Sequence, residues 1–136
     1  MHIRGWARCA SIAAVLSFSV VGCADLDTVR NAPLDKGVAR DFDVPYNHLT
    51  AATLTALSSV NVNLVSSSED ATGTTYIIDK SITFTSWGEV GRIYVKKAPA
   101  PPTTMIVYWE KRARGGEGIG AEEFTRVFFD AVAKQL

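Results

Sequence analysis

The feature that most constrains what this 136-residue chain can fold into is an uncharged apolar run at residues 10–23, ASIAAVLSFSVVGC. Arg4 and Arg8 precede it, and no acidic residue occurs before it ends. The apolar part spans about a dozen residues, whereas a helix needs roughly 20 to cross a bilayer. A basic head, a short apolar segment and small residues at the exit are typical of a secretory signal. We therefore expect residues 1–22 to be removed before the remainder folds.

The end of this run, Val20-Val21-Gly22-Cys23, resembles the bacterial lipobox, in which small or branched residues lead to a cysteine that is acylated before cleavage. The Cys23 thiol can accept a lipid as a thioether, and Gly22 leaves room for a peptidase. The resemblance implies a lipid anchor, such as palmitate-containing diacylglycerol, on Cys23, and a position on the periplasmic side of a cell membrane. Ordinary secretion stays open as an alternative, since small residues also fit the cleavage site of a soluble protein.

The residue after Cys23 bears on which membrane receives the anchor. Ala24 resembles the corresponding residue of lipoproteins destined for the outer membrane, where an aspartate would act as a retention signal. Asp25 comes one place later. The sequence therefore favours the outer over the inner membrane, with the chain facing the periplasm.

Composition limits what the remaining chain can be. Removing 22 of the 136 residues leaves 114, enough for one domain with its own core. Loss of Arg4 and Arg8 leaves twelve basic against fourteen acidic residues, and this balance argues against a nucleic-acid partner. Cys9 leaves with the signal and Cys23 would be acylated, so no disulfide is available and stability must come from packing.

The first residues after the lipobox show neither a helical nor a strand period. Residues 23–37 are mixed and polar, and we expect a flexible tether there. Such a segment has a root-mean-square reach of roughly 20 Å, enough to hold a domain off a lipid surface. A short docked strand or turn is the alternative. The single folded domain is expected over residues 38–136.

Two helices are expected in that domain. After Pro45, apolar and small residues recur at steps of three and four, which predicts one buried helix face. They are Tyr46, Leu49, Thr53, Ala56, Leu57 and Val60. A second helix is predicted over residues 121–134, with acidic residues in its first turn and a core contribution from Phe124, Val127 and Phe128.

Alternating patterns predict the strands. Residues 103–110 carry the clearest one, apolar on both faces, which indicates a central position or a second face covered by a helix. Weaker patterns occur at 38–44, at 62–65 before a turn-rich run, at 74–78, at 82–87, and at 92–96 after a break at 88–91. Prolines place residues 98–102 outside the sheet. The fold class that follows is α+β, an antiparallel sheet of four or five strands with two helices packed on one face.

The stretch before the first helix adds a second resemblance. Phe42-Asp43-Val44-Pro45-Tyr46, followed by Leu49, Ala52 and Leu57, is similar to small uncharacterised bacterial lipoproteins in which a tether leads to such a motif. The resemblance implies a periplasmic accessory or envelope protein without assigned catalysis.

Motifs that carry chemistry are few. His48 is the only histidine after the signal, and no G-x-S-x-G motif accompanies it, so we expect no catalytic residue. No Cys/His set has metal-ligand spacing, and neither a metal nor a cofactor is expected. The glycines at 116, 118 and 120 lack the residues of a phosphate-binding loop and predict a strand-to-helix connection.

Aromatic residues on the predicted strands offer the best candidate binding surface. Those left exposed on the sheet face away from the helices, together with basic residues of the glycine-rich loop, could meet an envelope protein or lipid phosphates. The candidates are Phe84, Trp87, Tyr94, Tyr108, Arg112 and Arg114. The leading hypothesis is a lipid-anchored, non-catalytic binding or accessory module. The alternative is a tethered periplasmic hydrolase with an unrecognised site.

Overall fold

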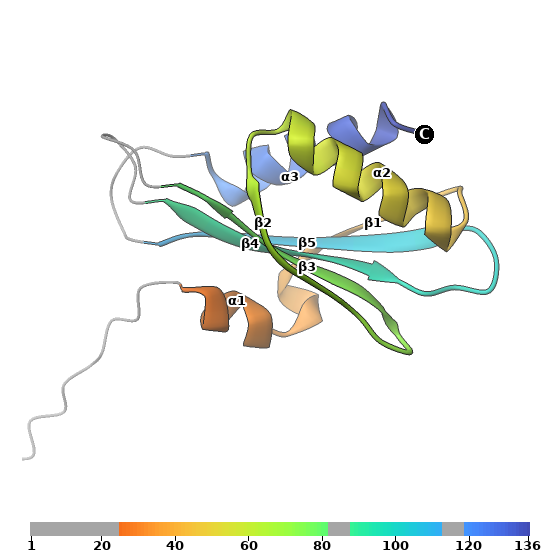
Figure 1. The fold of residues 1–136 in the computed structure, drawn as a ribbon, viewed down its shortest axis with the longest axis horizontal. Helices are drawn as coiled ribbons and strands as arrows, with labels where there is room; N and C mark the ends of the chain where they lie inside the picture. Colours follow the sequence, from red (N-terminus) through yellow and green to blue (C-terminus); the bar gives the residue numbers. More distant parts are fainter. Residues whose placement is uncertain (1–24, 82–87, 113–118) are drawn as a thin grey trace, which may run out of the picture.

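The computed structural model describes residues 25–81, 88–112 and 119–136. Its described part contains a five-stranded antiparallel sheet in the order β1-β5-β4-β3-β2, and helices cover both of its faces (Figure 1). The expected α+β fold is thus confirmed. The elements are α1 (Leu26–Asn31), the short 3-10 helix η1 (Leu34–Lys36), β1 (Val38–Phe42), α2 (Tyr46–Ser59), β2 (Asn63–Glu69), β3 (Gly73–Lys80), β4 (Glu89–Lys96), β5 (Thr103–Lys111) and α3 (Ala121–Ala133).

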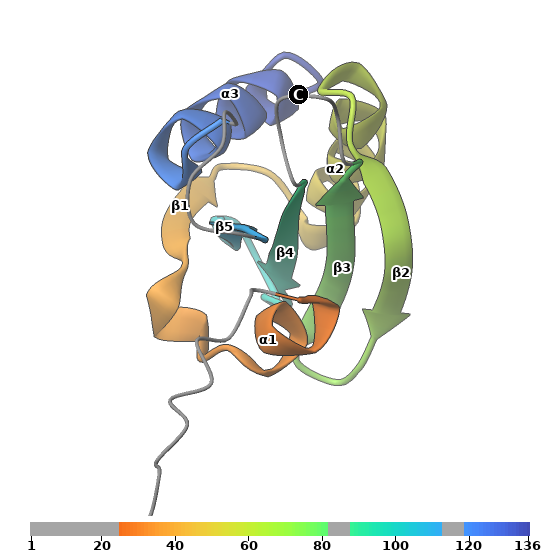
Figure 2. The same ribbon diagram turned by 90° about the vertical axis from the view of Figure 1, so that its left-hand side faces the viewer.

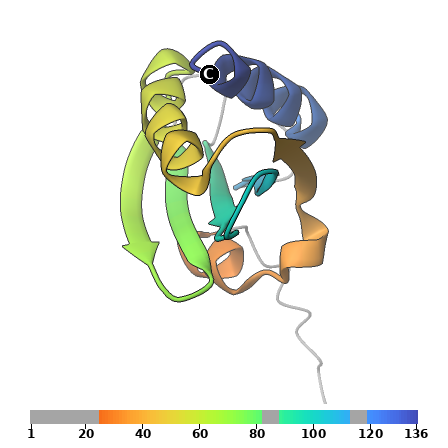
Figure 3. The ribbon, with the colours of Figure 1, turned by 90° about the vertical axis from the view of Figure 1, so that its right-hand side faces the viewer.

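The sheet separates two hydrophobic clusters. The larger one lies between the sheet and the two long helices α2 and α3, which run side by side over one face (Figure 3). The smaller one lies between the sheet and α1, and Figure 2 shows α1 on the face opposite α2 and α3. The prediction of two helices on one face is therefore confirmed, and the layer that α1 forms was not expected. No helix in the described ranges has both the length and the apolar character that crossing a membrane requires.

The prediction of a flexible tether is wrong for residues 25–37. Asp25 caps α1, since its Oδ1 accepts the backbone N–H of Thr28 at 2.8 Å. Val29 is fully buried against Ile77 and Val90. A helix of six residues shows no readable period, and its stability comes from tertiary contacts that the local sequence does not reveal.

The first long helix matches its prediction closely. Pro45 occupies the N-cap of α2, and the buried face consists of Leu49, Ala52, Thr53, Ala56 and Leu57. The hydroxyl of Thr53 is buried but donates to the Leu49 carbonyl at 2.7 Å, so its burial leaves no unpaired polar atom. The helical spacing in the sequence therefore identified the core face correctly.

The core face of the last helix is rotated from the predicted one. Phe124 stacks on Trp109 with ring centroids 3.6 Å apart, and Phe128 is fully buried, as expected. Val127 is only partly buried, whereas Phe129 packs edge-on against Phe42 of β1 at 6.0 Å. The prediction that Val127 contributes to the core is therefore wrong, and Phe129 takes that place. The reason is that α3 also covers β1 at the edge of the sheet, which turns Phe129 toward Phe42.

Two strand boundaries differ from the prediction. The serines at 66–68 lie inside β2 and do not form a turn, because β2 is an edge strand whose residues are all exposed. β4 begins at Glu89, so the predicted break at 88–91 is wrong for its last three residues. Gly91 is required there, since a Cβ would lie 2.7 Å from Cε3 of Trp109 and 2.9 Å from the Tyr108 carbonyl oxygen.

The strand β5 occupies the predicted central position, between β1 and β4. Its second face is covered as anticipated, because Tyr108 packs against the cluster beneath α1. The proline-containing segment between β4 and β5 lies outside the sheet, which confirms its prediction as a connection. The extended piece predicted at 82–87 lies outside the described residues.

Candidate functional site

A pocket lined by two tyrosines gathers the largest set of polar side chains among the described pockets. It has a volume of about 340 Å³ and lies where the first half of α2 crosses β2 and β3. We call it the tyrosine pocket. Its lining residues are Tyr46, Thr50, Ala51, Leu54, Ser67, Glu69, Thr74 and Tyr76.

A charged pair, Glu69 and Lys97, includes one residue of the tyrosine pocket lining. The Lys97 ammonium contacts Glu69 Oε1 at 2.7 Å and donates to the Asp70 carbonyl at 2.9 Å. It also lies 5.7 Å from the ring centroid of Tyr46, within cation–π range. The hydrogen bond from Lys97 lowers the pKa of Glu69, and the same contact raises the pKa of Lys97. Both groups therefore stay charged over the physiological range.

Hydroxyl groups supply much of the polar lining of the pocket. The Tyr46 and Thr74 hydroxyls are hydrogen-bonded to each other. Tyr76 is only 3% exposed, and its burial, with Tyr46 and Glu69 nearby, raises its pKa to about 12. A phenol with this pKa remains protonated at neutral pH and donates a hydrogen bond instead of accepting a proton. The pocket thus offers hydroxyls, an aromatic ring and an exposed leucine to a ligand.

The turn between β2 and β3 sets the geometry of the pocket. Asp70 Oδ1 accepts the Thr72 hydroxyl at 2.6 Å and the backbone N–H groups of Thr72 and Gly73 at 2.7 and 3.1 Å. The hydroxyl contact, followed by these backbone contacts, lowers the pKa of Asp70. Gly73 is needed because a Cβ there would lie 2.2 Å from the Val95 carbonyl oxygen. The resulting register places Glu69 directly opposite Thr74.

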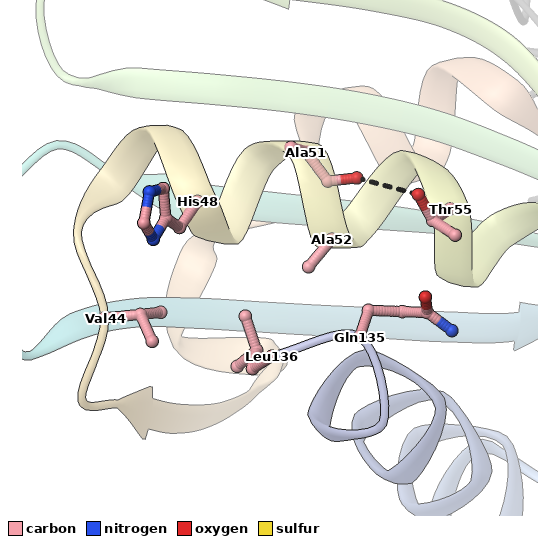
Figure 4. A pocket seen from close by; sticks show the side chains of 7 residues that line it. All are labelled: Val44, His48, Ala51, Ala52, Thr55, Gln135 and Leu136. Carbon is pink, nitrogen blue, oxygen red and sulfur yellow. Dashed lines mark hydrogen bonds between the residues drawn. The ribbon is translucent and has the colours of Figure 1, made fainter.

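A second pocket contains the lone histidine. It has a volume of about 280 Å³ and lies between α2 and residues 135–136, with His48 and Val44 at one end (Figure 4). Among the described residues, the His48 ring has no hydrogen bond or ion pair with a carboxylate or a hydroxyl. An orienting carboxylate, as in a Ser-His-Asp triad, is therefore not seen beside His48 in the part of the chain that the structure describes.

The two aromatic residues of the predicted surface that the structure describes, Tyr94 and Tyr108, do not form an open face. Tyr94 is 7% exposed, and its hydroxyl donates to the Thr72 carbonyl at 3.0 Å. Tyr108 is partly buried, and its hydroxyl donates to Glu110 at 2.6 Å. α1 covers this side of the sheet, so neither ring forms a free platform.

The remaining predicted site residues are placed as follows. Arg112 contacts Asp79 at 3.3 Å, at the end of the sheet where β3 and β5 finish. Phe84, Trp87, Arg114 and the lipidation candidate Cys23 lie outside the described residues.

The residues of the tyrosine pocket are not identified as a site by the sequence. Local patterns place Tyr46 on a helix and Tyr76 on a strand. These two tyrosines are 30 positions apart, and only the crossing of α2 over β3 brings them together. The one signal in the sequence that pointed toward such a pocket was the presence of hydroxyl-bearing residues within otherwise apolar helix and strand patterns.

Sequence analysis also missed Glu89. This side chain is 1% exposed, and among the described residues neither carboxylate oxygen has a hydrogen-bond partner. Its cross-strand neighbours are Lys80 and Lys111. A buried carboxyl without partners is uncommon and costs stability.

Neither a known relative nor a metal-binding cluster of the described residues assigns a function to the chain. The chain matches no protein-family model, and no curated protein is similar enough to count as a relative. Within the described residues, no three side chains of the metal-binding types come together. The chemistry of the pockets is therefore the basis for a functional assignment.

Proposed function

We propose that this chain is a lipid-anchored bacterial envelope protein whose folded domain faces the periplasm and acts as a non-catalytic binding or accessory module. The basic head, the short apolar run and the Val20-Val21-Gly22-Cys23 motif support acylation of Cys23. Ala24 favours the outer membrane as the destination. The partner is expected to be another envelope component.

The observation that carries the binding assignment is the chemistry of the tyrosine pocket. The Tyr76 hydroxyl is a neutral donor, since its pKa is about 12, and the one carboxylate of the pocket, Glu69, is held by Lys97. Such groups orient a ligand by hydrogen bonding and stacking but do not exchange protons with it at neutral pH. Leu54, 47% exposed at the rim, adds apolar contact area.

Mass spectrometry of the mature N-terminus tests the anchor. We expect a chain that begins at an acylated Cys23 and partitions into membranes, and a Cys23→Ser variant that stays unprocessed and loses this partitioning. An unmodified chain beginning at Asp25 would contradict the lipid anchor.

Binding through the tyrosine pocket is tested by substitution at its rim. Leu54→Glu places a charge at the pocket opening while keeping a good helix former on α2. We expect this variant to lose an envelope partner that the wild-type protein retains after cross-linking in intact cells. Asn31→Ala, an exposed change on α1, is the matched control and should retain it. Equal capture by both variants, or substrate turnover by the purified protein, would contradict the assignment.

A further inference from the structure

The short helix α1 is firmly attached to the sheet. Arg92 of β4 is only 5% exposed, and its guanidinium donates to the carbonyl oxygens of Val29 at 2.9 Å and Arg30 at 3.2 Å. Further donations reach the carbonyls of Ala32 and Pro33. Arginine is suited to this role because its planar fork carries five donors. Together with the buried Val29, these bonds fix where the chain enters the domain.

The direction of α1 defines one end of the molecule. Lys80 of β3, Glu89 of β4 and Lys111 of β5 lie opposite one another at what we call the anchor end of the sheet. Leu26, in the first turn of α1, packs on the cluster that contains Val90, next to Glu89. Ala32 and Pro33, which follow α1, accept hydrogen bonds from Arg92, which lies farther along β4 than Glu89. Figure 1 accordingly shows α1 beginning at the end of the sheet where β3 finishes and β4 starts.

Very little chain separates this helix from Cys23. Asp25 already caps α1, so Ala24 is the only residue between the cap and the cysteine. An extended chain covers at most about 3.5 Å per residue, so Cys23 lies within about 7 Å of the cap. The flexible reach of roughly 20 Å expected from the sequence is therefore absent.

From this we infer that the domain stands end-on upon the bilayer, with the anchor end of its sheet at the lipid headgroups and the tyrosine pocket at the far end. The inference depends on the proposed acylation of Cys23. Lys111 is exposed and Lys80 partly so, and both can extend their side chains to lipid phosphates. The tyrosine pocket lies near Gly73, at the opposite end of β3, which rises roughly 25 Å over its length.

Two cysteine substitutions at the ends of β3 test this orientation. Ser81→Cys and Ala71→Cys are small, exposed changes at the anchor end and at the β2–β3 turn. The acylated chain has no other free thiol, because its two cysteines are Cys9 in the signal and Cys23. Each variant is labelled with a fluorescent donor and reconstituted, acylated, in phosphatidylethanolamine–phosphatidylglycerol vesicles that carry a headgroup acceptor. Energy transfer should be several-fold stronger from residue 81 than from residue 71.

A linker insertion supplies the matched control. A Gly-Ser insert of about 20 residues between Ala24 and Asp25, with a root-mean-square length of roughly 25 Å, should bring the two transfer efficiencies close together. Equal transfer from both positions without the insert, or a difference that the insert leaves unchanged, would overturn the orientation while leaving the anchor intact. Absence of acylation and of vesicle binding in the unaltered protein would refute the proposed function itself, and the orientation with it.

Discussion

At the scale of single residues, Glu89 is the clearest conflict between burial and polarity in the domain. It alternates with Ile93 and Val95 and so faces the side of the sheet that α2 and α3 cover. The side chain is 1% exposed, and its carboxylate oxygens have no hydrogen-bond partner within the described ranges. An unsatisfied buried polar group costs about 1 to 3 kcal/mol. Removing both oxygens should therefore increase stability.

We predict that Glu89→Met raises the free energy of unfolding by about 1 to 3 kcal/mol, since it keeps the volume of the side chain and removes its unpaired oxygens. Glu89→Gln, which leaves a polar amide in the same place, should change it little. Urea denaturation at neutral pH measures both. A loss of stability in the Met variant would show that the carboxylate is paired in solution.

Tyr76 makes the stability of the domain sensitive to alkaline pH. Its pKa is about 12 in the folded protein against an ordinary value of 10.0. Because the folded state holds the phenolic proton more tightly, this contribution is fully present below pH 10 and is lost as pH rises from about 10 to 12. The difference corresponds to about 3 kcal/mol.

We predict that the wild-type free energy of unfolding falls over this alkaline interval and that Tyr76→Phe shows a smaller fall. Tyr108→Phe is an informative companion, because burial also raises the pKa of Tyr108 to about 12. Denaturant titrations between pH 9 and 12 give the curves. An identical pH dependence in wild type and Tyr76→Phe would mean that Tyr76 ionises normally.

At the scale of elements, α3 shows how an edge strand changes the face a helix buries. Phe129 is 5% exposed and packs against Phe42, while the Arg40 guanidinium lies 5.6 Å from its ring centroid. Val127 is only partly buried. The two positions therefore contribute very differently to the core.

We expect Phe129→Ala to lower the free energy of unfolding by about 3 to 5 kcal/mol, as removal of a buried aromatic ring does. Val127→Ala should cost about 1 kcal/mol, because Val127 is only partly buried and its methyl groups lose less burial than the Phe129 ring. Thermal and urea denaturation of the two variants compare them directly. Equal losses would support the helix face predicted from the sequence.

At the scale of the whole molecule, the α1 layer makes the sheet two-sided. It buries Ile77 and Val90 and provides the carbonyl partners of Arg92. Without it, two apolar side chains would meet water and a nearly buried guanidinium would lose its acceptors.

We predict that a chain beginning at Val38 is less stable than one beginning at Asp25 by roughly 3 to 5 kcal/mol, from lost burial and from the uncompensated arginine. It should also bind a hydrophobic dye that the longer chain does not bind. Unfolding curves and dye fluorescence of both chains measure this. If the two chains have the same free energy of unfolding, residues 25–37 do not stabilise the domain and act as the tether predicted from the sequence.

The sequence by itself determined the elements whose periodicity is long enough to read. α2 and β5 each repeat one pattern over several residues, and each fell where the pattern predicted it, as did the α+β class. Local spacing suffices in such cases because burial of one face requires it. The acylation motif at Cys23 is likewise a property of contiguous residues, and it stays a prediction.

Only the tertiary structure decided the features that depend on distant partners. α1 is too short to show a period and is held by Arg92, about 60 positions away. The tyrosine pocket exists because α2 crosses β3, and Tyr94 is buried because its hydroxyl meets the β2–β3 turn. A residue's own neighbours in sequence set its conformational preference, but what it contacts depends on packing and register across the sheet.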